Sequence, residues 1–522
     1  MTGSSAFRDT EGFVPVVIVG AGPTGITAAT LLAQYGISCL VLERWEDVYP
    51  QPRAVHLDDE IRRVVARLGV SDEFATISRP ALGLRLLDPE FKVLAQFDRN
   101  PAESVNGFPQ ASMFDQPEFE ALLRSNLKNY PCATIRGNCE VTDITQTELG
   151  QVRVTYADRG TGKGHVVEAA YVLGCDGANS VVRSSIGAAM RDLRFEQRWL
   201  VVDVATDVEL NQWDGVHQVC SPERAATYMR IGANRYRWEF RLLPNETADE
   251  YRNCAALRRL IAPWVSDVAD QDLKLVRVAE YTFRAQLANR WRDRNVFLLG
   301  DAAHLTPPFI GQGMGAGLRD ATNLAWKLAG VLNGDLSENV LDSYEQERKP
   351  HARMLISLAL GMGWAMTAGG SVGDAIRRTI VPRLHLLPGI RTRIVDSRTP
   401  AVHRSALVIK RRRPRQLAGT LCPNPVLPEG VRLDTALGIG FAVITTSQLS
   451  KQQRDQLRRR GAMIVTAEHG SDLGRWLRRA GANAAIIRPD RTVMQAGRRL
   501  SSLCDAVPNF TSGSNEERAE AN

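Results

Sequence analysis

The chain has 522 residues, a net charge of +7 and a pI of about 9.0. This length exceeds what one hydrophobic core usually holds and suggests roughly two to four domains. A content of 44% hydrophobic and 24% charged residues is ordinary for a globular protein rather than a fibrous or disordered one. Because arginine is scattered along the chain, we interpret the positive charge as a solvated basic surface rather than a site for an anionic partner.

Cysteine spacing and the apolar segments indicate the cellular compartment in which the protein is expected. The eight cysteines form no CxxC pair and no cluster with zinc spacing, so we expect reduced thiols, no metal site and a cytoplasmic protein. Residues 1–13 lack the apolar region of a signal peptide. Residues 354–373 carry no charge over about the length of a membrane span. Five of them are glycine, so we favour a buried or interface helix over a span.

The first predicted unit is a strand, a glycine turn, a helix and a second strand within about thirty residues. An apolar run at 14–20 leads into GAGPTG, helical spacing follows at 26–36, and another buried strand is predicted at 38–43. Helices are then expected at 58–69 and 116–130.

The middle of the chain is rich in β-forming residues. Strands are predicted at 152–158, 166–177 and 199–208, and 226–243 is typical of a hairpin that turns at Gly232–Asn234. We therefore expect two sheets in this region, one of them antiparallel.

The last third of the chain differs in composition from the rest. Residues 385–420 are rich in Arg, Pro and Leu and include KRRRPR at 410–415. We favour a solvated linker over a nucleic-acid patch, because no aromatic residues are interleaved with these charges. Short strands and helices over 440–497 predict a small α/β domain, and the polar ending SGSNEERAEAN predicts a disordered tail.

The GAGPTG turn carries the first chemical signal. Gly20 permits a tight turn, Gly22 lets a pyrophosphate approach the backbone, and Gly25 lets the helix pack close to the strand. The helix N-terminus then offers free N–H groups to phosphates. Glu43, at the end of the second strand, suits a carboxylate that accepts from a ribose hydroxyl. These features predict a dinucleotide site.

Two later segments accompany this turn. VLGCDGANSVVR, 172–183, contains Asp176 and Arg183, and NVFLLGDAAH, 295–304, brings Asp301 after an apolar run. The prolines and alternating glycines that follow, at 307–317, weaken helices and strands, so they indicate a close approach to a ligand. Together with GAGPTG, the two segments resemble the DG and GD motifs of the class A flavoprotein aromatic hydroxylases, the group of para-hydroxybenzoate hydroxylase and phenol hydroxylase.

This resemblance implies bound FAD, with NADH or NADPH as co-substrate. It places Asp301 on the ribityl chain, the loop 309–315 beside the isoalloxazine, and the N-terminus of a helix at 316–329 near the pyrimidine end of the ring. Gly315 departs from the family pattern, since many members have Asn there. The residues implied to bind FAD are Gly20, Ala21, Gly22, Pro23, Thr24, Gly25, Glu43, Arg44, Arg53, Gln116, Asp176, Gly300, Asp301, Gly311, Gln312 and Gly313. For Gln116, an N-terminal capping role is an equal alternative.

Within the family, residues 52–60, 307–329 and 341–352 resemble the 3-(3-hydroxyphenyl)propionate and 3-hydroxycinnamate hydroxylases, which insert oxygen ortho to the phenol. Residues 486–497 resemble the end of their thioredoxin-like domain, but without CxxC a redox role is not expected. The alternatives are a polyketide or antibiotic (rifampicin-like) tailoring monooxygenase and a non-catalytic FAD-binding protein.

Catalytic candidates follow from the same resemblance and from chemistry. A phenol reacts better as phenolate, so a base or relay is expected, and Arg53, His56 and Asp59 are the candidates, with surface polar residues at a helix start as the competing interpretation. Tyr228 is a further candidate. For a substrate carboxylate we expect one of Arg224, Arg230, Arg235 and Arg237.

The expected fold is α/β: a Rossmann-like FAD-binding domain, an interleaved substrate domain with an antiparallel sheet, and a small thioredoxin-like C-terminal domain. The expected partners are a small phenolic acid and O2, without nucleic acid or membrane span, in a possible homodimer. The expected domains are FAD binding at 14–80, 110–190 and 285–385, substrate at 81–109 and 191–284, a linker at 386–420, the C-terminal domain at 421–508 and the tail at 509–522.

Overall fold

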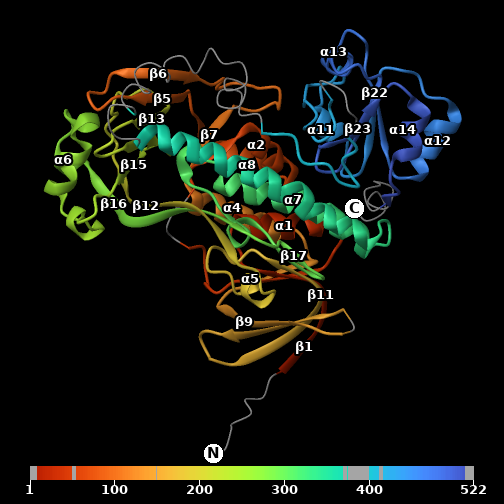
Figure 1. Cartoon of the computed structure of the whole chain (residues 1–522), viewed down its shortest axis with the longest axis horizontal. Helices are drawn as coiled ribbons and strands as arrows, with labels where there is room; N and C mark the ends of the chain where they lie inside the picture. The colour runs from red at the N-terminus through yellow and green to blue at the C-terminus, as the bar shows by residue number, and fades with distance from the viewer. Residues whose placement is uncertain are drawn as a thin grey trace, which may run out of the picture.

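The computed structural model describes residues 9–49, 54–148, 150–367, 373, 399–410 and 416–511. Two large sheets form the body of the molecule, and the C-terminal elements form a lobe beside α2, α7 and α8 (Figure 1). The helices of the body are α1 (Pro23–Gln34), α2 (Asp59–Arg67), α3 (Ser71–Thr76), α4 (Gln116–Leu127), α5 (Val181–Ser185), α6 (Cys254–Val265), α7 (Gly313–Leu332) and α8 (Asp342–Thr367).

The first sheet has a parallel centre in the order β18-β11-β1-β2-β8. Its apolar runs are buried on both faces, as expected of parallel strands covered by helices: Val16, Val17 and Ile18 are fully buried. Its strands are β1 (Asp9–Val19), β2 (Cys39–Leu42), β8 (Ala133–Arg136), β9 (Cys139–Gln146), β10 (Val152–Asp158), β11 (Gly164–Gly174), β17 (Arg292–Asp293) and β18 (Val296–Leu298).

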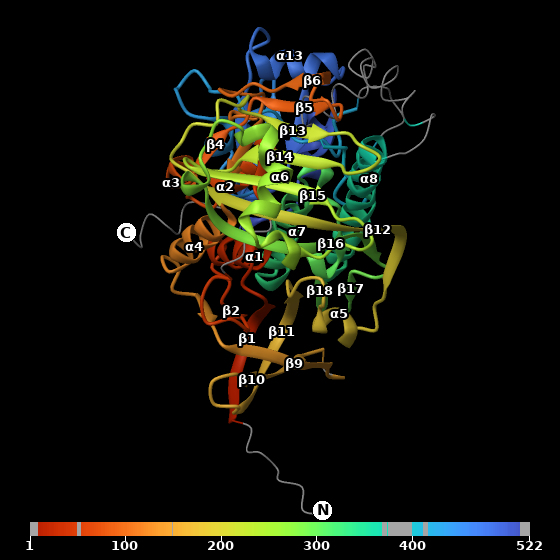
Figure 2. The ribbon, with the colours of Figure 1, turned by 90° about the vertical axis from the view of Figure 1, so that its left-hand side faces the viewer.

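The second sheet is largely antiparallel and runs β19-β16-β12-β15-β14-β13-β5-β6. Helix α6 covers one face (Figure 2), and β14 and β15 form the predicted hairpin. A separate small sheet, β3-β7-β4, leads into α2. The strands are β3 (His56–Asp58), β4 (Ser78–Pro80), β5 (Gly83–Leu87), β6 (Val93–Asp98), β7 (Ala111–Phe114), β12 (Met190–Ala205), β13 (Val216–Val219), β14 (Ala226–Arg230), β15 (Arg235–Arg241), β16 (Lys274–Ala288) and β19 (His304–Leu305).

The C-terminal lobe has a four-stranded sheet ordered β21-β20-β22-β23, with β20 and β21 parallel and the other pairs antiparallel. This βαβ unit followed by an antiparallel pair and a helix is the thioredoxin-like arrangement that the sequence predicts. Its elements are α11 (Leu433–Ala436), β20 (Ala442–Thr445), α12 (Lys451–Arg459), β21 (Met463–Thr466), α13 (Asp472–Arg479), β22 (Ala484–Ile487), β23 (Val493–Gly497) and α14 (Leu500–Ala506).

Two expectations for the C-terminal third need correction. Phe510, in the predicted tail, is fully buried and contacts the rings of Tyr35, Trp326 and Phe441, because it closes the apolar seam between the lobe and the body. Residues 399–410, in the predicted solvated linker, pack against the body, with Val408 fully buried. The rest of the tail, most of the linker and the segment 411–415 lie outside the described residues.

The apolar stretch at 354–373 lies largely in α8. Searched over the described ranges, the helices include none with the length and hydropathy of a membrane span, and the same ranges contain no cluster of His, Cys, Asp and Glu that could hold a metal ion. The cysteines described, seven in number, are free thiols.

Candidate functional site

The glycine turn after β1 has the geometry of a ligand cradle. Gly20 has a φ of +100°, and a Cβ on it would lie 2.5 Å from the carbonyl oxygen of Cys175, so a side chain does not fit. A Cβ on Gly25 would collide with the carbonyl of Gly20. Around Gly22, in contrast, a Cβ would meet nothing within 4 Å. The first and third glycines therefore allow the packing, while the second exposes the backbone to open space at the start of α1.

Glu43 closes the other side of this turn. Its Oε2 accepts from the backbone N–H of Ala21 at 2.7 Å, and its Oε1 accepts from that of Trp45 at 3.0 Å. A cavity of about 190 Å³ lies beside it, lined by Gly20, Gly22, Pro23, Glu43, Arg44, Gln116 and Asp176 among others. The sequence-predicted residues of the adenosine end thus gather around one space.

In the DG segment, the carboxylate of Asp176 holds the local backbone in place. Asp176 accepts from the hydroxyl of Ser180 at 2.5 Å and from the backbone N–H of Val181 at 2.7 Å, so it holds the start of α5. Arg183 donates to the carbonyl of Ala302 at 3.1 Å, which connects the DG segment to the GD segment. This connection was not evident in the sequence.

The GD segment is held by a buried acid that the sequence analysis missed. Asp320 of α7 accepts from the backbone N–H of Gly300 at 3.1 Å and from Nε of Arg348 at 2.8 Å, and it lies 2.7 Å from the ring of His304. Its contacts with Arg348 and His304 lower its pKa against the opposing effect of burial. Asp301 projects instead to the wall of a second cavity.

This second cavity, of about 400 Å³, lies between the first sheet's glycine-rich segments and the second sheet. We call it the flavin-side cavity. It shares Gly22, Pro23, Gln116, Cys175 and Gly177 with the cavity beside Glu43, so the two spaces meet above the first glycine turn. Together they form an elongated space that runs from Glu43 to Gly313.

The four alternating glycines serve two purposes. Gly311 has a φ of +61°, and Gly313 opens α7 on the wall of the flavin-side cavity, where a Cβ would meet only the carbonyl of Thr306 at 3.8 Å. Gly315 and Gly317 lie inside α7, one facing Ile61 and the other Thr24 of α1. The sequence predicts a loop over 309–315 and a helix from 316, whereas α7 already begins at Gly313, so Gly315 and Gly317 both lie in the helix, where they allow close helix packing.

Of the catalytic candidates, His56 lines the flavin-side cavity. Its Nε2 accepts from Nη1 of Arg99 at 2.9 Å, and its Nδ1 lies 3.3 Å from the carbonyl of Gly311. Burial, together with Arg99, lowers the pKa of His56 to about 4. The ring is therefore neutral at pH 7 and both nitrogens are engaged.

The remaining candidates lie elsewhere. Asp59 accepts from Asn106 at 3.0 Å and does not line the flavin-side cavity, and Tyr228 is buried in the aromatic core under α6. The Gln312 side chain donates to Asp58 at 2.9 Å, away from that cavity. Arg53 lies outside the described residues.

Gln116 and one of the four arginines do reach the cavity. Gln116 is the first residue of α4, after the N-cap Asp115; its Oε1 accepts from the backbone N–H of Ala54 at 2.6 Å and its Nε2 donates to Glu120 at 2.6 Å. Arg237 lines the cavity but is held by Asp203 at 2.6 Å. The other three arginines pair with carboxylates outside the lining: Arg224 with Glu246, Arg230 with Glu209 and Arg235 with Asp115.

Several lining residues were missed by the sequence analysis. All but Arg99 and Phe309 lie on strands of the second sheet, where side chains alternate between the two faces, so this alternation is the signal that could have found them. Gln218 is the most informative, because its Nε2 donates to the carbonyl of Phe309 at 3.1 Å while its buried Oε1 has no partner among the described residues. The residues missed are Arg99, Trp199, Gln218, Thr227, Glu239, Tyr281, Phe283 and Phe309.

Comparisons with known proteins agree with this geometry. The sequence model of the family described as "FAD binding domain" matches residues 13–359. A 3-(3-hydroxy-phenyl)propionate/3-hydroxycinnamic acid hydroxylase of Burkholderia vietnamiensis is 31% identical over 98% of this chain and 99% of its own. A probable NADH-specific resorcinol 4-hydroxylase of Rhodococcus jostii is 37% identical over 68% of this chain and 66% of its own.

Solved structures share the fold. The flavin-dependent monooxygenase PieE, in complex with FAD and substrate, superposes with a TM-score of 0.79 at 21% identity, covering 95% of this chain and 98% of its own. Aklavinone-11 hydroxylase, with FAD and aklavinone, gives a TM-score of 0.77 at 22% identity over 97% of this chain and 100% of its own.

Proposed function

This chain belongs to the FAD-dependent aromatic hydroxylases, and from that premise we propose that it hydroxylates a small phenolic acid ortho to its hydroxyl group, using O2 and NADH or NADPH. The observation that carries the proposal is the flavin-side cavity, which has the glycine loop at 311–313 on one wall and polar and aromatic side chains of the second sheet on the other. Our best candidate substrate is 3-(3-hydroxyphenyl)propionate, on the resemblance to the Burkholderia relative.

The residues present fit FAD. Gly22 leaves room for a pyrophosphate at the N-terminus of α1, where free N–H groups favour anions. Glu43 stands at the adenosine end, and Asp301 at the middle of the elongated site. Gly313 brings the N-terminus of α7 to the far end, where the helix dipole stabilises negative charge. When bound, the flavin supplies the redox chemistry, taking hydride from the nicotinamide and delivering one oxygen atom of O2.

The protein's own part is to place and activate the phenol. Gln218 offers an unpartnered buried oxygen next to the glycine loop, which suits a hydrogen bond from the phenol hydroxyl. Glu239, on β15 of the same sheet, lines the same cavity, and burial raises the pKa of its carboxyl. A carboxyl with a raised pKa is better matched to accepting a phenolic proton. We therefore assign Gln218 to orientation and Glu239 to proton transfer.

The carboxylate of the substrate needs a cation. Two arginines, Arg99 and Arg237, line the described wall of the cavity. Arg237 is held in a bidentate pair by Asp203, whereas Nη1 of Arg99 donates to the neutral ring of His56. We assign the substrate carboxylate to Arg99, whose guanidinium lines the cavity beside His56.

The decisive experiment follows NADH oxidation by the FAD-loaded protein with 3-(3-hydroxyphenyl)propionate, its amide and resorcinol. We expect the acid to stimulate oxidation and to give the 2,3-dihydroxy product. The amide should bind at least about tenfold more weakly, because a charge-assisted hydrogen bond contributes roughly 1.5–3 kcal/mol. Arg99→Gln should remove this difference and Arg99→Lys should keep part of it.

Resorcinol hydroxylation is the second candidate, favoured by the 37% identity to the Rhodococcus protein. Resorcinol has no carboxylate, so its oxidation should not depend on Arg99. Faster coupled turnover of resorcinol than of the acid would reject the phenolic-acid assignment and leave the hydroxylase family unaffected.

A further inference from the structure

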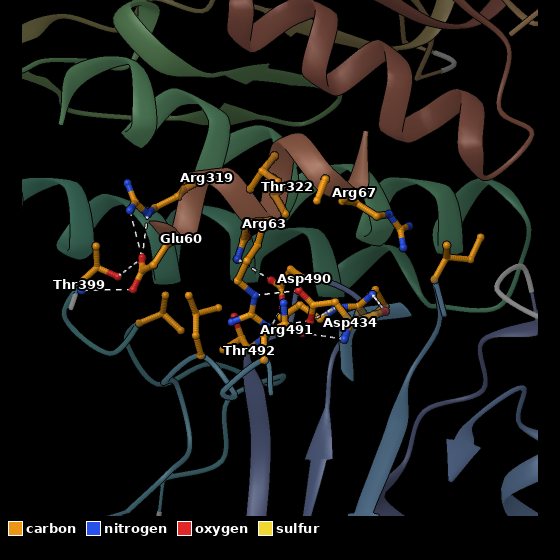
Figure 3. A pocket seen from close by; sticks show the side chains of 18 of the residues that line it. Glu60, Arg63, Arg67, Arg319, Thr322, Thr399, Asp434, Asp490, Arg491 and Thr492 are labelled. Atoms are coloured by element: carbon orange, nitrogen blue, oxygen red, sulfur yellow. Dashed lines mark hydrogen bonds and ion pairs between the residues drawn. The ribbon is translucent and has the colours of Figure 1, made fainter. Parts of the chain in front are cut away.

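A third cavity, of about 330 Å³, lies between the body and the C-terminal lobe, and we call it the interlobe cavity. Its lining residues come from α2, α7 and α8 on the body side, and from α11 and the β22–β23 loop on the lobe side (Figure 3). It shares no lining residue with the flavin-side cavity. A volume of this size is in the range of small-molecule sites.

One end of the interlobe cavity carries more cations than anions. Asp434 accepts from Nε and Nη2 of Arg63 at 2.8 and 2.7 Å, and it also lies 3.1 Å from Nε of Arg491. Within the part of the chain that the structure describes, Arg67, one helical turn after Arg63, donates only to neutral groups, which are Gln34, Tyr35 and the carbonyl of Gly438. Three guanidinium groups therefore share one carboxylate.

The nearby carboxylate of Asp490 does not offset this excess of positive charge. Arg488, which is fully buried, donates to both oxygens of Asp490 and so neutralises it. Burial and the repulsion from Arg491 lower the pKa of Arg67, as expected for a cation that lacks a full counter-charge.

Besides this excess of positive charge, an unpaired donor of Arg491 also indicates a binding site for an anion. Its residue is 9% exposed, and its Nη2 donates to the carbonyls of Asp434 and Gly438 at 3.0 and 2.6 Å. Its Nη1 is buried and has no hydrogen-bond partner within the described ranges. Leaving a buried charged donor unpaired is costly, so an anion at this position would stabilise the protein.

The opposite end of the cavity has the reverse charge. Glu60 shares Arg319 with Asp58, at 3.0 and 2.6 Å, so two carboxylates face one guanidinium. The lining also includes apolar residues, namely Val64, Phe108, Pro400, Val402, Leu421 and Ile439. An inorganic anion would fill only the cationic end, whereas an organic acid could fill the cavity.

We propose that the interlobe cavity is a second ligand site, which binds a small organic carboxylate with its carboxyl group at Arg67 and Arg491 and its apolar body along Val64 and Ile439. The site is separate from the one where the phenol is hydroxylated. Its occupant bridges the body and the lobe, because Arg67 belongs to α2 and Arg491 to the β22–β23 loop.

The test uses the FAD-loaded full chain and titration calorimetry with benzoate, hexanoate and inorganic phosphate as probes. We expect benzoate or hexanoate to bind, and Arg491→Gln to weaken that binding at least about tenfold, the loss typical of one charge-assisted bond. Arg432→Gln is the matched control, because Arg432 lines the same cavity but has its own carboxylate, Glu103, at 2.8 Å. It should change the affinity less than about twofold.

A second variant keeps the test decisive if Arg491→Gln misfolds. Thr322→Leu adds volume on the α7 wall of the cavity without changing charge, and it should abolish binding while FAD content and circular dichroism stay the same. The proposal is overturned if no organic acid binds, if phosphate binds more tightly than both acids, or if benzoate binds equally well to the wild type and both variants. The last result would place benzoate in the flavin-side cavity.

Discussion

His56 illustrates how contacts decide what a polar side chain can do. Chemistry alone makes a histidine beside a flavin a candidate base, but its Nε2 accepts from Arg99 and its Nδ1 faces the carbonyl of Gly311. With a pKa lowered to about 4, the ring stays neutral and connects the glycine loop to Arg99. Its role is to hold two other residues in place.

The first prediction concerns Asp59, whose pKa is raised from 3.8 to about 7 by burial and by the carboxylate of Asp58. Because the folded state holds this proton more tightly than the unfolded state, the group's contribution to stability falls as pH rises from about 4 to 7. Asp59→Asn removes that loss. The melting temperature of the variant relative to the wild type should therefore be higher at pH 8 than at pH 4.5, and an equal difference at both values would contradict the assignment.

The second prediction tests Gln218 as the residue that orients the phenol. Gln218→Leu keeps the volume but removes the oxygen that has no partner. We expect kcat/KM for the phenol to fall about tenfold or more, in line with the roughly 1–3 kcal/mol cost of an unsatisfied polar group, with FAD content unchanged. Gln212→Leu is the control, since Gln212 bonds the carbonyl of Trp264 outside the cavity. A fall only in FAD affinity would assign Gln218 to the cofactor instead.

At the scale of elements, the alternation of side chains between the two faces of a strand separates residues that line the cavity from residues of the core. On β15, Arg237 and Glu239 line the flavin-side cavity, while Tyr236, Trp238 and Phe240 face the core under α6. The same alternation puts Thr227 and Met229 of β14 in the cavity and Tyr228 in the core. Tyr228 was thus the wrong choice by one position, although the hairpin itself was predicted correctly.

The glycine turn was predictable in detail for a different reason. The need for glycine there is largely local, since Gly20 takes a φ of +100° and a Cβ on Gly25 would meet the carbonyl of Gly20 in the same βαβ unit. Asp59 and Gln312 could not be placed this way. Which way each points depends on Asp58, Asn106 and Arg319, partners brought together only by tertiary packing.

The third prediction concerns the N-terminus of α7. Gly313→Val places two methyl groups on the wall of the flavin-side cavity where we expect the ring, so the protein should fold but bind FAD poorly or oxidise NADH without forming product. The measurement is FAD per chain and the ratio of product to NADH consumed. Gly361→Val, on an open position of α8, is the matched control and should leave both unchanged. Normal FAD content and coupling in Gly313→Val would move the ring away from this loop.

At the scale of the molecule, the sequence predicts the order of the elements but not the tertiary contacts between them. Apolar periodicity predicts the N-terminal βαβ unit, the hairpin and the C-terminal βαβ unit, because each of these patterns is continuous in the chain. The contacts that join the lobe to the body are single side chains far apart in sequence, such as Arg63 with Asp434 and Phe510 with Tyr35. Only the folded chain reveals them.

The last prediction tests one of these contacts, the ion pair between Arg63 and Asp434. Arg63 of α2 donates to both oxygens of Asp434 and, through Nη1, to the carbonyl of Cys422 at 2.7 Å, and its side chain is only 4% exposed. Arg63→Met removes these bonds but leaves Asp434, whose side chain is 21% exposed, with Arg491 at 3.1 Å, so we expect a cost of about 1–3 kcal/mol, the range for losing a hydrogen bond to a charged group. We expect the lobe to lose its docking first, so that calorimetry shows an early transition before the one that releases FAD. Arg475→Met, which removes an exposed pair with Asp472, should cost less than about 1 kcal/mol. A single transition at the wild-type temperature in Arg63→Met would mean that the apolar seam around Phe510, rather than this ion pair, holds the lobe in place.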